Sequence, residues 1–115
     1  MRRRSLASVK IISDSRARVE QAVHAYAAAL HRRPEVRRII WFGSRISGRP
    51  TPGSDVDLCI VLSGSNIPLR DRIPEYLPGA FPVGLDLFPY TEEELARLQQ
   101  CSPGWYAAIE RGREL

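Results

Sequence analysis

Apolar residues between positions 15 and 33 recur at the three- and four-residue spacing of one helical face. They are Val19, Ala22, Val23, Tyr26, Ala27 and Leu30. The Ser-Asp-Ser stretch at 13–15 offers N-cap side chains, and Pro34 cannot continue the pattern. We therefore expect a helix that begins near Ser15 and ends before Pro34.

Three shorter apolar runs lack this period and predict buried strands. They span residues 36–42, 55–62 and 81–90. A segment rich in Gly, Pro and Thr at 48–54 predicts a loop between the first two. The prolines of residues 63–80 favour an irregular connection that holds at most one short helix, at 69–76.

Two helices are expected after the third strand. Thr91 with Glu94 three residues later forms a capping-box pattern and predicts a helix start. Pro103 and Gly104 interrupt that helix, and a last short helix is expected at 105–111. Together the elements predict an α/β (α+β) domain with a small mixed β-sheet and helices packed mainly on one face.

The length of 115 residues and 43% hydrophobic content suit one compact domain, expected at 15–115, behind a basic N-terminal arm at 1–14.

Cys59 and Cys101 show neither a disulfide framework nor a zinc-ligand spacing, so both are expected to be free thiols. No stretch approaches the roughly 20 apolar residues of a membrane span. The expected location is the cytoplasm, without a membrane partner.

The net charge of +4 comes almost wholly from arginine, because Lys10 is the only lysine among 17 basic residues. Such a surface favours phosphate-bearing or acidic partners. Arginine enrichment through codon usage or growth at high temperature is an alternative explanation of the excess.

Asp55 and Asp57 lie one residue apart at the start of the second apolar run. Side chains alternate along a strand, so both carboxylates point to one face and repel each other unless a cation neutralises them. All-oxygen ligands at a strand end suit Mg²⁺. Two solvated aspartates at a strand start are the alternative.

Gly43 and Ser44 form a turn ahead of this pair that can offer N–H groups and a hydroxyl to a phosphate, with Arg45 and Arg49 close in sequence. Asp86 is the only acidic residue of the third apolar run. If the third strand lies beside the second, Asp86 completes a triad that can bridge two metal ions; the alternative is a salt bridge with an arginine.

The pattern Gly-Ser, ten residues, Asp-x-Asp and a later strand aspartate resembles the nucleotidyltransferase superfamily that includes DNA polymerase beta, and in particular its minimal members. The resemblance implies that Gly43, Ser44, Arg45 and Arg49 bind the nucleotide phosphates. It also implies that Asp55, Asp57 and Asp86 are the catalytic residues and hold two Mg²⁺ ions, with ATP as substrate.

The minimal members usually act with a small helical HEPN protein, so the resemblance implies an antitoxin that adenylylates a tyrosine of a HEPN toxin within a hetero-oligomer. A homodimer is also compatible with it. Two alternatives remain open: an antitoxin that neutralises its partner by binding alone, and a small RNA-binding protein.

RNA binding is disfavoured because only nine residues are aromatic and Trp41, Phe42 and Phe81 are expected in the core. Trp105, Tyr106 and Ile109 step along the last helix, where they either close the core or form a docking patch.

Overall fold

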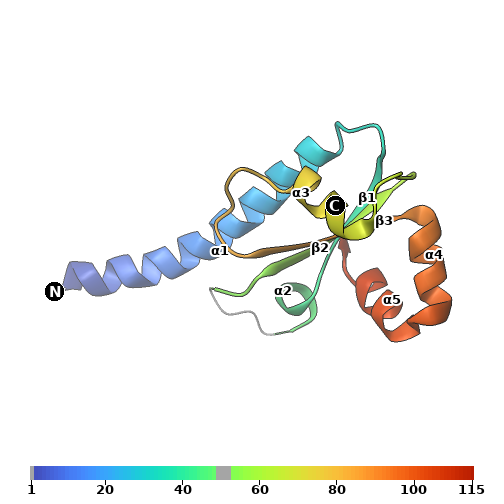
Figure 1. Cartoon of the computed structure of the whole chain (residues 1–115). Coiled ribbons are helices and arrows are strands. Elements are labelled where there is room, and N and C mark those ends of the chain that lie inside the picture. The colour runs from blue at the N-terminus through green and yellow to red at the C-terminus, as the bar shows by residue number, and fades with distance from the viewer. Residues whose placement is uncertain (1, 49–52) are drawn as a thin grey trace.

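The computed structural model describes residues 2–48 and 53–115 of the chain (Figure 1). In chain order the elements are α1 (Arg2–Leu30), β1 (Val36–Phe42), α2 (Ser44–Ser47), β2 (Val56–Leu62), α3 (Leu69–Tyr76), β3 (Leu85–Thr91), α4 (Glu92–Cys101), α5 (Pro103–Glu110) and β4 (Arg113–Glu114). No helix in the described ranges is long and apolar enough to span a bilayer.

The strands form one mixed sheet in the order β3-β2-β1-β4. β1 is antiparallel to both β2 and β4, whereas β2 and β3 run parallel and are joined by the crossover that contains α3. The predicted fold class, a small mixed sheet with helices, is confirmed. The third strand begins at Leu85, four residues later than the apolar run at 81–90 predicts.

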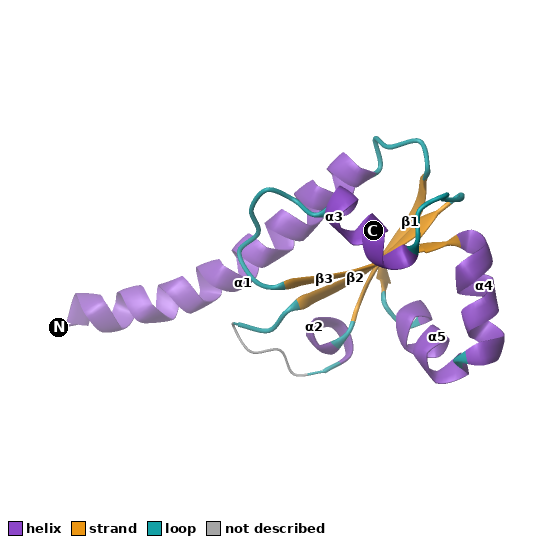
Figure 2. Ribbon diagram, viewed as in Figure 1, coloured by secondary structure: helices purple, strands orange, loops and turns teal. Residues whose placement is uncertain are grey.

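Helices cover both faces of the sheet (Figure 2). Val19, Val23 and other α1 residues pack with Tyr76 of α3 on one face. Leu95 of α4 and Ile109 of α5 pack on the other. The expected packing mainly on one face therefore needs correction, because β1 and β2 are apolar on both sides and each side needs a cover.

Helix α1 begins at Arg2 and runs through the Ser-Asp-Ser stretch where we expected its N-cap. Residues 2–30 contain neither Gly nor Pro, and Ser and Asp inside a helix cost only about 0.5 kcal/mol each. The predicted basic arm thus continues the helix, and its first half projects beyond the sheet (Figure 1).

The short elements α2 and β4 were not predicted. β4 pairs with β1 through only two residue pairs, Ile40 with Glu114 and Trp41 with Arg113. Arg38 of β1 fixes this end of the chain, because its guanidinium donates to the carboxylates of Glu110 and Glu114 at 2.9–3.2 Å. These elements have too few residues for a detectable period.

A buried arginine ties α3 to α4. Arg72 is 4% exposed, and it donates to both carboxylate oxygens of Glu94 at 2.6 and 2.9 Å and to the carbonyl oxygen of Pro89 at 3.0 Å. Glu94 also accepts the Thr91 N–H at 2.9 Å, which confirms the predicted capping box. The hydrogen bonds from Arg72 lower the pKa of Glu94 to about 2.

This pair predicts a pH dependence of folding. The folded-state pKa of Glu94 is depressed, so its contribution is present above about pH 4.5 and is lost as the pH falls towards 2. Glu94→Gln should lower the free energy of unfolding at pH 7 by on the order of 2 kcal/mol, since Arg72 stays buried without its counter-ion. The difference in the free energy of unfolding between Glu94→Gln and the wild type, measured by urea unfolding, should become smaller as the pH falls towards 2.

Glu93→Gln is the matched control on the same helical turn. Glu93 pairs with Arg97 at 2.9 Å, but its side chain is 82% exposed, so this substitution should leave stability nearly unchanged. Equal effects of the two substitutions would contradict the special role of the buried pair.

Candidate active site

Gly43 ends β1 and places the backbone against a carboxylate. Its φ of 91° is unfavourable for residues with a Cβ. A Cβ at this position would also lie 2.1 Å from Oδ2 of Asp57. The turn after β1 therefore requires glycine on two counts, and it brings the start of α2 beside Asp57.

Helix α2 closes this turn. The N–H groups of Ile46 and Ser47 donate to the Gly43 carbonyl oxygen at 3.0 Å. Ser44 is the first helical residue and is exposed, and an N–H at this position has no acceptor within its own helix. The Gly-Ser turn thus lies beside Asp57 with Ser44 exposed, and a phosphate contact through its N–H and hydroxyl stays a prediction.

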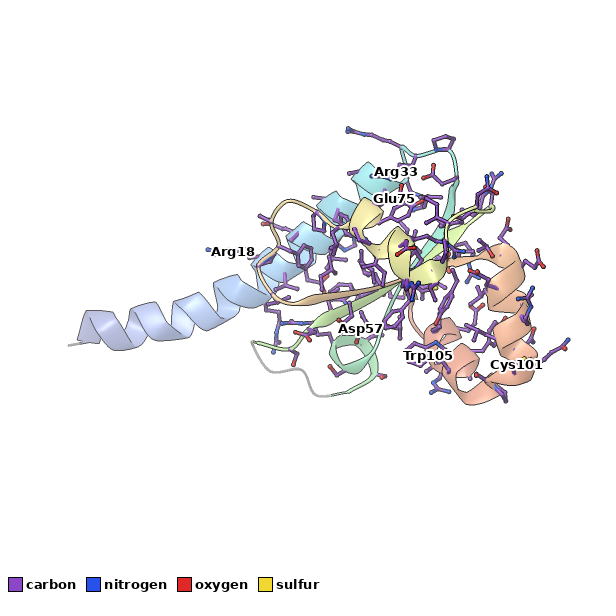
Figure 3. All side chains as sticks on the ribbon, in the orientation of Figure 1. Arg18, Arg33, Asp57, Glu75, Cys101 and Trp105 are labelled. Atoms are coloured by element: carbon purple, nitrogen blue, oxygen red, sulfur yellow. The ribbon has the colours of Figure 1, made fainter. Side chains whose placement is uncertain are left out.

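The parallel register of β2 and β3 places Asp57 opposite Asp86. The antiparallel register of β1 and β2 places Phe42 opposite Asp57, so all three residues share one face of the sheet. Asp57 is half-buried, and Figure 3 shows it at the end of β2 near α2. The two aspartates predicted from separate strands are therefore neighbours.

The neighbourhood raises the pKa of Asp57 to about 6. Burial is the largest cause, followed by the charge of Asp86, a hydrogen bond with Asp86 and the charge of Asp55. A carboxylate pair in contact shares a proton or attracts a cation, because two adjoining negative charges repel each other. The charges of Asp55 and Asp86 thus both act on Asp57 in the fold.

Asp55 precedes β2 and packs against Gly84, a residue that the sequence patterns did not single out. A Cβ on Gly84 would lie 2.2 Å from Oδ1 of Asp55, and the Gly84 carbonyl accepts the Val56 N–H at 2.9 Å. The signal was a glycine two residues before Asp86 inside an apolar run. Glycines thus make room for both carboxylates of the Asp-x-Asp pair.

Arg45 and Arg49 were predicted to contact phosphate. Arg45 donates from Nε to the Ser54 carbonyl oxygen at 2.8 Å, and it lines a cavity with Trp41 and with α1 residues on the α1 side of the sheet. This contact holds Ser54 against α2. Arg49 lies outside the described residues.

The carboxylates suit a divalent cation by their chemistry. Carboxylate oxygens are the ligands that Mg²⁺ prefers, and the mutual repulsion of Asp55, Asp57 and Asp86 is relieved by positive charge. Across the described part of the chain, no three potential ligand side chains are already arranged around a common metal position. Asp57 and Asp86 lie opposite each other on neighbouring strands, and Asp55, just before β2, adds a third negative charge.

Residues 25–101 match the model of a protein family described as a nucleotidyltransferase domain. The matched segment contains the Gly-Ser turn and all three aspartates. The fold is similar to the crystal structure of a presumed nucleotidyltransferase from Sulfolobus solfataricus, with a TM-score of 0.58 and 22% sequence identity. That alignment covers 75% of this chain and 78% of the other. No curated protein matches the sequence.

Replacing Asp57 by asparagine should stabilise the metal-free protein above about pH 6. The folded-state pKa of Asp57 is raised, so its favourable contribution holds below the ordinary value of 3.8 and is lost as the pH rises through about 6. We expect Asp57→Asn to gain about 1 kcal/mol at pH 8, a few degrees in melting temperature, and almost nothing at pH 4. Thermal melts at pH 8 and at pH 4, in the presence of a chelator, measure the two differences. Asp71→Asn, at an exposed position, is the control.

Gly43→Ala should destabilise the protein by at least about 1 kcal/mol, because the new methyl group meets Asp57 at an unfavourable φ. Gly64→Ala places its methyl group in open space and should change the free energy of unfolding by less than about 0.5 kcal/mol. Chemical denaturation of the two variants provides the comparison. A tolerated Gly43→Ala would argue against the close approach of turn and carboxylate.

Proposed function

Because the chain belongs to the nucleotidyltransferase domain family, we propose that it transfers a nucleoside monophosphate, AMP from ATP, to a hydroxyl group of a partner protein. The observation that carries the proposal is the apposition of Asp57 and Asp86 across β2 and β3, with the Gly43 turn beside them. This arrangement supports a site that combines negative ligands for a metal with donors for phosphate.

Each side chain has a role in the proposed reaction. The Gly43–Ser44 turn holds the terminal phosphates through N–H and hydroxyl donors. Asp55, Asp57 and Asp86 hold two Mg²⁺ ions, which when bound offset the charge of the phosphates. Asp86 is exposed, so an acceptor hydroxyl can reach it from solvent.

The step is an in-line displacement at the α-phosphorus. The acceptor oxygen forms a bond to that phosphorus while the bond to the oxygen bridging the α- and β-phosphates breaks, and pyrophosphate leaves with the electron pair. The hydroxyl proton passes to Asp86. Asp86 lies opposite Asp57 in the register of β2 and β3, so the proton acceptor stands beside the carboxylates that would hold the metal.

We further propose that the acceptor is a tyrosine of a HEPN-type toxin and that the protein acts as its antitoxin in a hetero-oligomer. Asp55 and Asp86 are exposed at one end of the sheet, where a side chain of a folded partner can approach. The proposal follows from the resemblance of the motif to minimal nucleotidyltransferases. Neutralisation by binding alone is the competing outcome.

Transfer of label tests the activity. We expect the wild-type protein, incubated with Mg²⁺ and ATP labelled on the α-phosphate, to transfer the label to a HEPN-type partner, for which the product of the neighbouring gene is the candidate to test. Asp57→Asn should lower the rate by at least on the order of 100-fold, because a charge that binds the metal is lost. Asp71→Asn, an exposed substitution of the same kind on α3, should retain the wild-type rate.

The same assay separates the alternatives. A tight complex without labelled partner would favour neutralisation by binding and would contradict the enzymatic proposal. An Asp57→Asn variant that transfers label at the wild-type rate would show that the carboxylate pair is only a solvated end of the strands and takes no part in the reaction.

A further inference from the structure

An aromatic cluster adjoins the carboxylates on the same face of the sheet. Phe42 lies opposite Asp57 in the antiparallel register, and Phe88 follows Asp86 by two residues on β3. Their ring centroids are 5.6 Å apart. The sheet therefore carries a layer of carboxylates at its end and a layer of aromatic rings immediately behind it.

Trp105 of α5 covers this aromatic layer. Its ring centroid lies 5.4 Å from that of Phe42 and 5.2 Å from that of Phe88, with interplanar angles of 82° and 70°. Both contacts are T-shaped, and Trp105 nevertheless stays partly exposed to solvent. Figure 3 shows Trp105 on the side of the molecule where Asp57 lies.

The exposure of Trp105 is unusual for its position. Trp105 is 36% exposed as a residue, whereas Trp41 of β1 is 2% exposed. Nε1 of Trp105 donates to the Tyr90 hydroxyl at 3.1 Å, which fixes the orientation of the indole. The preceding residue, Gly104, has open space where a side chain would be. A partly exposed indole is thus held against Phe42, the residue that lies opposite Asp57.

We propose that Trp105 is the stacking platform for the base of the nucleotide, with Tyr90 as the positioning residue. The inference rests on the proposed function, in which the Gly43 turn and the aspartates hold the phosphates. In a nucleotide, the ribose lies between the α-phosphate and the base. In the fold, Phe42 lies between Asp57, its cross-strand partner, and Trp105, whose ring it contacts. A nucleotide with its phosphates at the aspartates therefore extends its base towards Trp105. Stacking on a π-face tolerates every base, so Trp105 supplies affinity for the base with little selectivity among nucleotides.

The experiment compares a ligand that has a base with one that lacks it. Calorimetry in Mg²⁺ measures the dissociation constants of ATP and of inorganic triphosphate for the wild type, Trp105→Leu and Trp105→Phe. Leucine keeps an apolar contact with Phe42 and Phe88 but has no π-face. Phenylalanine keeps a ring and serves as the conservative control.

We expect Trp105→Leu to weaken ATP about tenfold and to leave triphosphate unchanged, with Trp105→Phe within about threefold of the wild type for both ligands. A Trp105→Leu protein that binds ATP as tightly as the wild type would overturn the inference, because the platform would then be only a cover for the sheet. Equal loss of ATP and triphosphate would do the same, since it would indicate a general disturbance of the fold.

These outcomes are distinguishable from a failure of the proposed function. If the wild type binds triphosphate and ATP with equal affinity, the result supports the phosphate site and contradicts the proposal that Trp105 stacks on the base. If the wild type binds neither ligand, the result contradicts the proposed function, and it also contradicts the proposed role of Trp105.

Discussion

The proximity of Asp57 and Asp86 is the constraint on which the other features of the site depend. Like charges on neighbouring strands oppose folding, and here the parallel register of β2 and β3 holds them together. A shift of β2 by one residue would turn the Asp57 carboxylate to the face where Val56 and Leu58 are fully buried, and the cost of burying that charge disfavours the shifted register. The core thus stabilises an arrangement that the carboxylates alone would not adopt.

The crossover between β2 and β3 is held by an ion pair remote from the site. Arg72 of α3 reaches the Pro89 carbonyl of β3 and both oxygens of Glu94 at the start of α4. A bidentate contact of this kind fixes orientation as well as distance. The position of β3, and with it that of Asp86, therefore depends on a buried arginine that touches no carboxylate of the site.

Much of this architecture could be predicted from the sequence, because the signals are local. The period of α1, the apolar runs and the Thr91 to Glu94 box are all read within one window of the chain, and strand alternation placed Asp55 and Asp57 on one face. The start of α1 was missed because Ser and Asp are ambiguous between a cap and a helix interior. Gly84 and the helices on the second face depend on which segments meet in space, which local patterns do not specify.

The same tertiary dependence gives the exposed tryptophan its significance. Within the sequence, Trp105 is one apolar position of a short helix, and its spacing to Ile109 fits either a core contact or a docking patch. In the fold, Ile109 is fully buried while Trp105 lies at the boundary, in contact with Phe42, the cross-strand partner of Asp57, and with Phe88 on the strand of Asp86. The chain thus uses one end of α5 to close the core and the other to shape the surface beside the carboxylates. A small domain with few exposed aromatic residues gains binding surface in this way without added elements, because the residues that complete its core also border its site.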